Sequence, residues 1–181
     1  MTDRIRVMVV DDHPMWRDAV ERDLVAAGFE VVATASTGTE AVNRFAATRP
    51  QVVVLDLQIP EPSGVEVTAE VLRTDPASRV LILSASGEQD DVLAAVKAGA
   101  TGYLVKSASR EELLEAVGRT ALGEAVFTPG LAGLVLGEYQ RLSTAPSASS
   151  GPPAPKLTER ETEVLRLIAR LPFLFIAGRM Y

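Results

Sequence analysis

Three acidic side chains directly follow two apolar runs that have the composition of buried strands. Asp11 and Asp12 come after residues 5–10, and Asp56 comes after Val52–Leu55. In a parallel sheet both runs would end at the same edge, so the three carboxylates would share one pocket. Carboxylate oxygens bind hard cations, of which Mg²⁺ is the expected one. Such a cluster can also receive a phosphoryl group, because the cation neutralises the charge of the transferring oxygens.

Two more polar side chains end later apolar runs. Ser84 ends residues 80–84, and Lys106 follows Gly102–Val105. At the same sheet edge, a hydroxyl and an ammonium would contact phosphate oxygens. Carboxylates this close repel one another, and without a cation or Lys106 one of them would take up a proton. Each acid alone could be an ordinary helix cap or loop residue, so the interpretation depends on the whole set occurring together.

Strand and helix patterns alternate along the first two thirds of the chain. The predicted strands are Arg6–Val10, Glu30–Ala35, Val52–Leu55, residues 80–84 and Gly102–Val105, and the predicted helices cover residues 14–27, 37–48, 63–73, 89–98 and 109–122. Capping boxes begin three of these helices, at Thr37, Ser63 and Ser109. This alternation predicts an α/β fold, a flavodoxin-like, doubly wound sheet of five parallel strands with its ligand site beyond their carboxyl ends.

The composition excludes several functional classes. The chain has 181 residues, 47% of them hydrophobic and 5% aromatic, which is enough for a full core of mainly aliphatic side chains. A formal net charge of −6 argues against a globally basic nucleic-acid binder, although a local basic patch is compatible with it. The absence of cysteine excludes disulfides and thiolate metal sites. No apolar run approaches the roughly 20 residues of a membrane span and no signal-peptide pattern occurs, so we expect a cytoplasmic protein without a membrane partner.

The pattern changes after Gly123, which ends a domain that covers residues 1–123. Residues 124–142 can form one connecting helix. Residues 143–155 are rich in Pro and Ser, and this composition predicts a flexible, extended linker. A further capping box from Thr158 to Glu161 begins a helix over residues 159–170, and Pro172 should end it.

A set of short motifs occurs in order at the ends of the predicted elements. The motifs are Asp11-Asp12-His13-Pro14, Asp56-Leu57-Gln58-Ile59-Pro60, Gly64, Leu83-Ser84-Ala85, Gly99-Ala100, Gly102-Tyr103 and Lys106. With them, residues 5–122 resemble the phosphoacceptor receiver domain of a bacterial two-component response regulator. The segments from Gly99 to Ser107 and from Leu157 to Leu165 are similar to the NarL/FixJ-type subfamily. The output domain of that subfamily is a DNA-binding helix-turn-helix of LuxR type.

The resemblance implies a role for each acidic residue at the sheet edge. Asp56 would accept a phosphoryl group from a phosphohistidine on a sensor histidine kinase and form an acyl phosphate. Asp12 and Asp56 would bind Mg²⁺ through their side chains, Asp11 through a water molecule, and Gln58 through its main-chain carbonyl. The chain would then catalyse its own phosphorylation, and it would not be a conventional enzyme.

The same resemblance implies a phosphate-dependent switch. Lys106 would pair with the phosphate oxygens, and Ser84 would shift inward to donate its hydroxyl to the same phosphate. Tyr103 would move from an exposed to a buried position as Ser84 moves, and the surface over residues 89–122 would carry the signal. His13, the single histidine, is interpreted as the residue at the start of the first helix and not as a ligand or a phosphoacceptor.

The tail departs from the family pattern. After Arg170 the family expects a turn, a scaffold helix and a recognition helix, whereas this chain continues with an apolar segment that contains Pro172 and Phe173. Residues 156–181 therefore correspond to an incomplete helix-turn-helix output domain, without an element that could enter a DNA groove. A frameshift or cloning scar, natural decay and a docking peptide would each explain the tail. The abrupt change favours a truncated or frameshifted output domain.

Two functions are compatible with these observations. The first is a response regulator in which phosphorylation of Asp56 switches a transcription-regulating, DNA-binding output. The alternative is a stand-alone phosphosignal receiver that acts through protein contacts without DNA binding. Promoter DNA is the expected partner of the intact parent protein and is in question for this chain, and a homodimer is compatible with the sequence. Aspartate-nucleophile phosphatases carry a second aspartate where this chain has Gln58, and the P-loop pattern of GTPases is absent.

Overall fold

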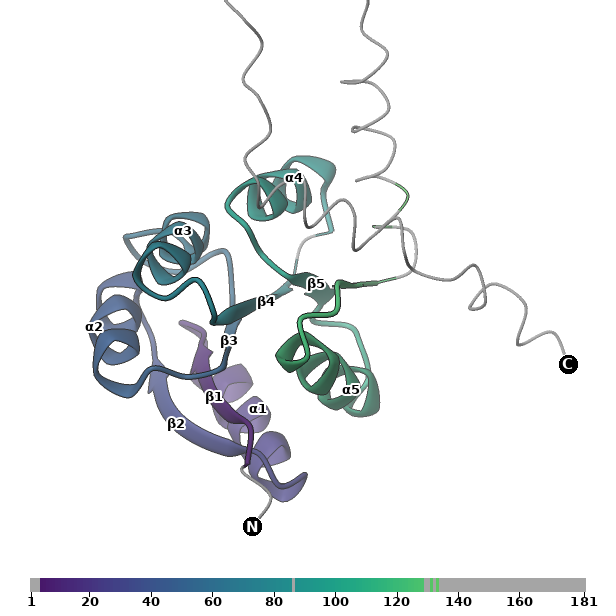
Figure 1. The fold of residues 1–181 in the computed structure, drawn as a ribbon. Helices are drawn as coiled ribbons and strands as arrows, with labels where there is room; N and C mark the ends of the chain where they lie inside the picture. Colours follow the sequence, from purple (N-terminus) through teal and green to yellow (C-terminus); the bar gives the residue numbers. More distant parts are fainter. Residues whose placement is uncertain (1–3, 86, 129–130, 132, 134–181) are drawn as a thin grey trace, which may run out of the picture.

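The computed structural model describes residues 4–85, 87–128, 131 and 133, which form a parallel sheet with helices on both faces (Figure 1). The strand order is β2-β1-β3-β4-β5-β6, and every neighbouring pair is parallel, so the predicted doubly wound α/β fold is confirmed. None of the helices that the structure describes is long and apolar enough to span a membrane. The strands are β1 (Arg6–Val10), β2 (Glu30–Ala35), β3 (Val52–Leu55), β4 (Arg79–Ser84), β5 (Gly102–Val105) and β6 (Val126–Phe127). The helices are α1 (Pro14–Ala26), α2 (Gly38–Thr48), α3 (Gly64–Thr74), α4 (Gln89–Lys97) and α5 (Arg110–Ala121).

Alternate side chains of the central strands enter two separate apolar cores. On β1, Val7 and Val9 belong to the core under α1 and α5, whereas Met8 and Val10 belong to the core under α2, α3 and α4 (Figure 1). Because helices cover both faces, β1 and β3 consist almost only of aliphatic residues. Burying one such side chain contributes roughly 1.5–3 kcal/mol. The two cores therefore hold the strand ends, and the side chains that follow them, in place.

Side-chain caps begin three helices, as the sequence predicts. Ser63 and Ser109 each form a full capping box with the glutamate three residues later. Thr37 forms only half of one, because its hydroxyl accepts from the N–H of Glu40 while the Glu40 carboxylate accepts from the N–H and the hydroxyl of Ser36. The predicted capping box at Thr37 is corrected accordingly. Ser36 offers two donors to the same carboxylate oxygen, and these contacts replace the return bond to Thr37.

A short sixth strand lies beside β5, where the sequence predicts only five strands. Val126 and Phe127 pair in parallel with Gly102 and Tyr103, and this pair covers the outer edge of β5. A strand of two residues leaves no periodic signal, so the sequence pattern assigns residues 124–142 to a connecting helix. Most of that range lies outside the described residues, as do the predicted linker over 143–155 and the output segment over 156–181.

Candidate functional site

The ends of β1 and β3 bring two of the predicted acids together. Val10 pairs with Leu55 in the parallel ladder, so Asp11 and Asp56 are the next residues on neighbouring strands. The N–H of Asp56 donates to the carbonyl of Val10 over 2.9 Å, and the N–H of Asp11 donates to the carbonyl of Ala35 over 3.1 Å. Both residues are buried, with 3% of Asp11 and 4% of Asp56 exposed. Two neighbouring buried carboxylates require positive charge nearby.

Lys106 supplies that charge from the end of β5. Its Nζ lies 2.7 Å from Oδ2 of Asp11 and 2.7 Å from Oδ2 of Asp56. Burial alone would lower the pKa of Lys106, but the hydrogen bonds and negative charges of Asp11 and Asp56 outweigh it and raise this pKa above its ordinary value of 10.5. The ammonium is therefore charged at neutral pH and bridges the two carboxylates.

Main-chain N–H groups hold the second oxygen of each carboxylate. Oδ1 of Asp11 accepts from the N–H of His13 over 2.9 Å, and Oδ1 of Asp56 accepts from the N–H of Gln58 over 3.2 Å. Contacts on both oxygens fix the orientation of each carboxylate. Gln58 itself is exposed and its main chain lies at the site, while the metal-binding role of its carbonyl stays a prediction.

Close backbone packing also sets the position of Asp56. A Cβ atom on Gly64, the first residue of α3, would lie 2.4 Å from the carbonyl oxygen of Asp56 and 2.6 Å from Cα of Leu57. Carbon atoms of neighbouring residues do not approach backbone atoms so closely, so only glycine fits there. The N–H of Gly64 donates to the carbonyl of Leu57 over 3.1 Å. The glycine thus lets α3 begin directly against the strand end that carries Asp56.

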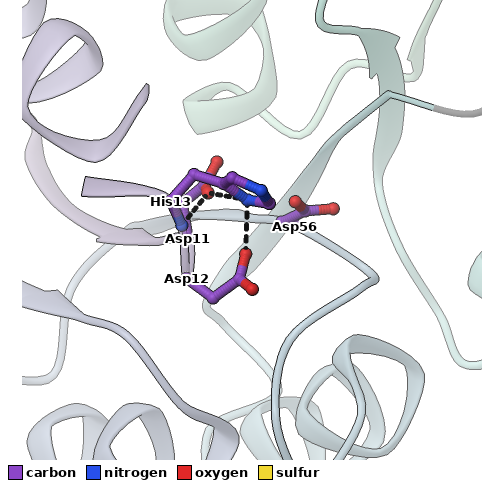
Figure 2. Close-up of side chains that lie close together, drawn as sticks. All are labelled: Asp11, Asp12, His13 and Asp56. Atoms are coloured by element: carbon purple, nitrogen blue, oxygen red, sulfur yellow. Dashed lines mark hydrogen bonds and ion pairs between the residues drawn. The ribbon is translucent and has the colours of Figure 1, made fainter. Parts of the chain in front are cut away.

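Asp12 and His13 complete, with Asp11 and Asp56, a group of four side chains of the types that can hold a metal ion. One ligand atom from each lies within 4.8 Å of all the others (Figure 2). Oδ1 of Asp12 is buried and accepts no hydrogen bond from the described residues, although Nδ1 of His13 lies 2.7 Å away. Three carboxylates suit a hard cation such as Mg²⁺, and a cation would satisfy this oxygen. The residues at this edge therefore fit the predicted cation site.

Ser84 and Tyr103 lie on the adjacent strands β4 and β5, and both are fully buried. Burial raises the pKa of the Tyr103 hydroxyl above its ordinary value of 10.0, and a hydrogen bond with the Ser84 side chain opposes the increase. The N–H of Lys106 donates to the carbonyl of Ser84 over 2.8 Å, which ties Ser84 to the residue that contacts Asp56. The structure shows Tyr103 in a buried position, and its movement between exposed and buried positions stays a prediction.

Arg17 is a residue of this site that the sequence analysis does not identify. It lies near the start of α1, and its Nη1 donates to the main-chain carbonyl of Asp11 over 2.8 Å. The available signal is a cation close to a helix N-terminus, where the helix dipole favours negative charge. A cation in that position needs a local acceptor, which the carbonyl of Asp11 provides. Arg17 therefore positions the loop between β1 and α1, which carries Asp12.

Trp16 and a small cavity flank Lys106. The ammonium lies 5.5 Å from the centre of the Trp16 ring, which is within the range of a cation–π contact. A cavity of about 100 Å³ lies next to them, and its lining includes residues of α1 and α5. Nε of Arg110 pairs with Oδ1 of Asp23 over 3.2 Å at this cavity. Trp16 is the only tryptophan of the chain and is 42% exposed, so its fluorescence can report on the acidic cluster.

Comparison with known proteins defines the class of this chain. Residues 7–118 match the response regulator receiver domain family. The chain is 38% identical over 168 residues to the probable transcriptional regulatory protein NarL of Mycobacterium tuberculosis, covering 92% of this chain and 74% of that protein. It is 32% identical over 176 residues to the nitrate/nitrite response regulator protein NarL of Escherichia coli, covering 96% and 80%. The solved signal receiver domain of the M. tuberculosis NarL superposes with a TM-score of 0.64 at 37% identity, covering 67% of this chain and 99% of that one.

The fold and the matched residues place the chain in the family of response regulator receiver domains. Within that family, the relatives show that it is a NarL-type response regulator. The resemblance seen in the motifs is thus confirmed. The individual roles of Asp56, Lys106, Ser84 and Tyr103 stay predictions.

Proposed function

We propose that Asp56 accepts a phosphoryl group from a phosphohistidine on a sensor histidine kinase in the presence of Mg²⁺. One observation carries the proposal: the buried Asp56 carboxylate shares the Lys106 ammonium with Asp11, at the edge where Asp12 offers a third carboxylate. The ammonium on one oxygen and the N–H on the other fix the orientation of the carboxylate. Attack on phosphorus requires that orientation.

In the proposed reaction, a carboxylate oxygen of Asp56 forms a bond to phosphorus while the bond from phosphorus to the donor imidazole breaks. The imidazole keeps the electron pair of that bond and takes up a proton, and an acyl phosphate remains on the protein. The donor is already activated, so the site needs to supply position and charge neutralisation and no strong general base. Asp11, Asp12 and Asp56 would hold Mg²⁺, which when bound neutralises charge on the transferring oxygens.

Lys106 keeps its place during this reaction because it has two carboxylate partners. When Asp56 becomes an acyl phosphate, the contact of 2.7 Å with Asp11 still holds Nζ at the site. The ammonium then lies next to the new phosphate oxygens, with which charge-assisted hydrogen bonds are strong. Because the N–H of Lys106 is bonded to the carbonyl of Ser84, the phosphate would be linked to the ends of β4 and β5.

Intact-mass measurement tests the phosphoacceptor. A small phosphodonor with Mg²⁺ should add one phosphoryl group to the wild-type chain and none to Asp56→Asn. Asp90→Asn is the matched control, since Asp90 is exposed in the first turn of α4 and lies outside the cluster, and it should be labelled like the wild type. Labelling of the Asp56→Asn variant would assign the site elsewhere.

The proposed output is transcription regulation through DNA. The similarity to a probable transcriptional regulatory protein over 92% of the chain supports it. The alternative is a receiver that acts through protein contacts alone. Fluorescence anisotropy with duplexes of different sequence at physiological salt separates the two. A tight complex with one duplex only would support the DNA-binding output, and negligible discrimination between the duplexes would support the alternative.

A further inference from the structure

His13 makes no contact of the kind expected from a helix-capping side chain. It is the N-cap of α1, with an extended backbone at φ −85° and ψ 111°, yet its side chain forms no capping hydrogen bond. The imidazole is 65% exposed, so it can turn without loss of packing. Its neighbours are the acids of the cation site.

The imidazole lies at the edge of this site, next to its carboxylates. Nδ1 lies 2.7 Å from Oδ1 of Asp12 and 3.6 Å from Oδ1 of Asp11. Figure 2 shows the ring beside these two carboxylates with Asp56 next to them, and all four ligand atoms lie within 4.8 Å of one another. Two ligands of one cation at about 2.1 Å each lie up to about 4.2 Å apart. A small rotation of the exposed ring closes the difference.

We infer that His13 becomes a nitrogen ligand when the divalent cation at this site is one that binds imidazole, such as Zn²⁺. The inference rests on the proposed function, because the same three carboxylates would hold Mg²⁺. The buried Oδ1 of Asp12 supports it, since this atom has no hydrogen-bond partner among the described residues although Nδ1 of His13 lies 2.7 Å away. A cation bound to both atoms satisfies the carboxylate oxygen and the imidazole lone pair together.

The two kinds of ion use His13 differently. Mg²⁺ prefers oxygen ligands and keeps several waters, so its affinity depends little on an imidazole. Zn²⁺ binds imidazole nitrogen as well as carboxylate oxygen, and first-row ions toward the end of the series gain most from such mixed sites. The three carboxylates and Lys106 set the charge of the site, while His13 sets its selectivity.

The direct test is a nitrogen resonance of the wild-type chain. His13 is the only histidine, so in the untagged full chain labelled with ¹⁵N-histidine every imidazole signal has one source. We expect Zn²⁺ to change the ¹⁵N chemical shift of Nδ1 to that of a metal-bound imidazole, whereas Mg²⁺ should leave this chemical shift unchanged. If both ring nitrogens keep the chemical shifts of a free imidazole at saturating Zn²⁺, the inference is wrong. This measurement requires no variant to fold.

Calorimetric titration of variants gives the second test. His13→Phe keeps a planar ring but has no nitrogen that could bind the ion. His13→Asn, which also lacks the imidazole, keeps a good N-cap and serves as the second variant. We expect His13→Phe to bind Zn²⁺ about tenfold more weakly or worse, with little change for Mg²⁺. Asp12→Asn should weaken the binding of both ions, because it removes charge from the common site. Equal Zn²⁺ affinities of the wild type and His13→Phe would contradict the assignment of the ligand.

Phosphorylation separates this inference from the function on which it rests. A small phosphodonor with Mg²⁺ and without Zn²⁺ should label the wild-type chain. A wild-type chain that is never labelled would refute the phosphoacceptor role of Asp56. The nitrogen resonance with Zn²⁺ would still decide whether His13 is a ligand.

Discussion

Nζ of Lys106 lies the same distance, 2.7 Å, from Oδ2 of Asp56 and from Oδ2 of Asp11. The lysine thus joins two buried acids that follow different strands. One ammonium does not neutralise Asp11, Asp12 and Asp56 together, so the site keeps a net negative charge. That charge favours a divalent cation beside the lysine.

Replacing Lys106 by methionine keeps the aliphatic stem and removes the bridging charge. Without divalent cation we expect the free energy of unfolding to fall by about 1–3 kcal/mol, because Asp11 and Asp56 lose their shared partner. Added Mg²⁺ should restore part of the loss in urea unfolding. Lys97→Met, at an exposed position of α4, is the control and should stay within about 0.5 kcal/mol of the wild type. A free energy of unfolding of Lys106→Met that does not change with Mg²⁺ would argue against a site shared by the lysine and the cation.

Alkaline pH should destabilise the fold through two groups. The pKa of Tyr103 is raised above 10.0 by burial, and that of Lys106 is raised above 10.5 by its carboxylate partners, which outweigh its burial. The folded chain then holds protons that the unfolded chain releases, so stability is full below these ordinary values and falls as pH rises through the raised ones. Circular dichroism over the alkaline range should show a later onset of unfolding for Tyr103→Phe. An unchanged onset would mean that Tyr103 ionises freely.

Removing the guanidinium of Arg17 should weaken cation binding without touching a ligand. Its contact with the carbonyl of Asp11 positions the loop that carries Asp12, so we expect Arg17→Ala to lower Mg²⁺ affinity about tenfold. The fluorescence of Trp16 provides the titration signal. Arg22→Ala on the same helix is the matched control, because Arg22 is exposed and should leave the affinity unchanged. Equal affinities of the two variants would show that the loop holds its shape alone.

Two glycine-to-alanine changes should have opposite effects. Gly64→Ala places a Cβ 2.4 Å from the carbonyl oxygen of Asp56, so we expect a loss of about 1–3 kcal/mol and slower phosphorylation as α3 moves away. Gly118→Ala in α5 meets no atom within 4 Å and should stabilise the fold by about 0.4–1 kcal/mol. Thermal and urea unfolding of both variants check this. A tolerated Gly64→Ala would mean that the start of α3 adjusts easily.

Much of the fold could be predicted from the sequence, because local signals control where elements begin and end. Four of the five predicted strands have the observed bounds. The remaining one, predicted over residues 80–84, lacks only Arg79 of the observed β4. Ser63 and Ser109 begin their helices as predicted, since a capping box acts within four residues. β6 could not be predicted, because its two residues form a strand only through the free edge of β5.

The sequence by itself determined which side chains follow the strands, and therefore that Asp11, Asp12, Asp56 and Lys106 would gather at one edge. Only the tertiary structure decided how they meet. That Lys106 bridges Asp11 as well as Asp56 depends on the relative position of β1, β3 and β5, which no spacing along the chain encodes. The contact of Arg17 with Asp11 and the approach of His13 to Asp12 likewise require the turn of the chain between β1 and α1. Local periodicity sets the order of the residues, whereas packing of distant segments sets the direction of each polar group.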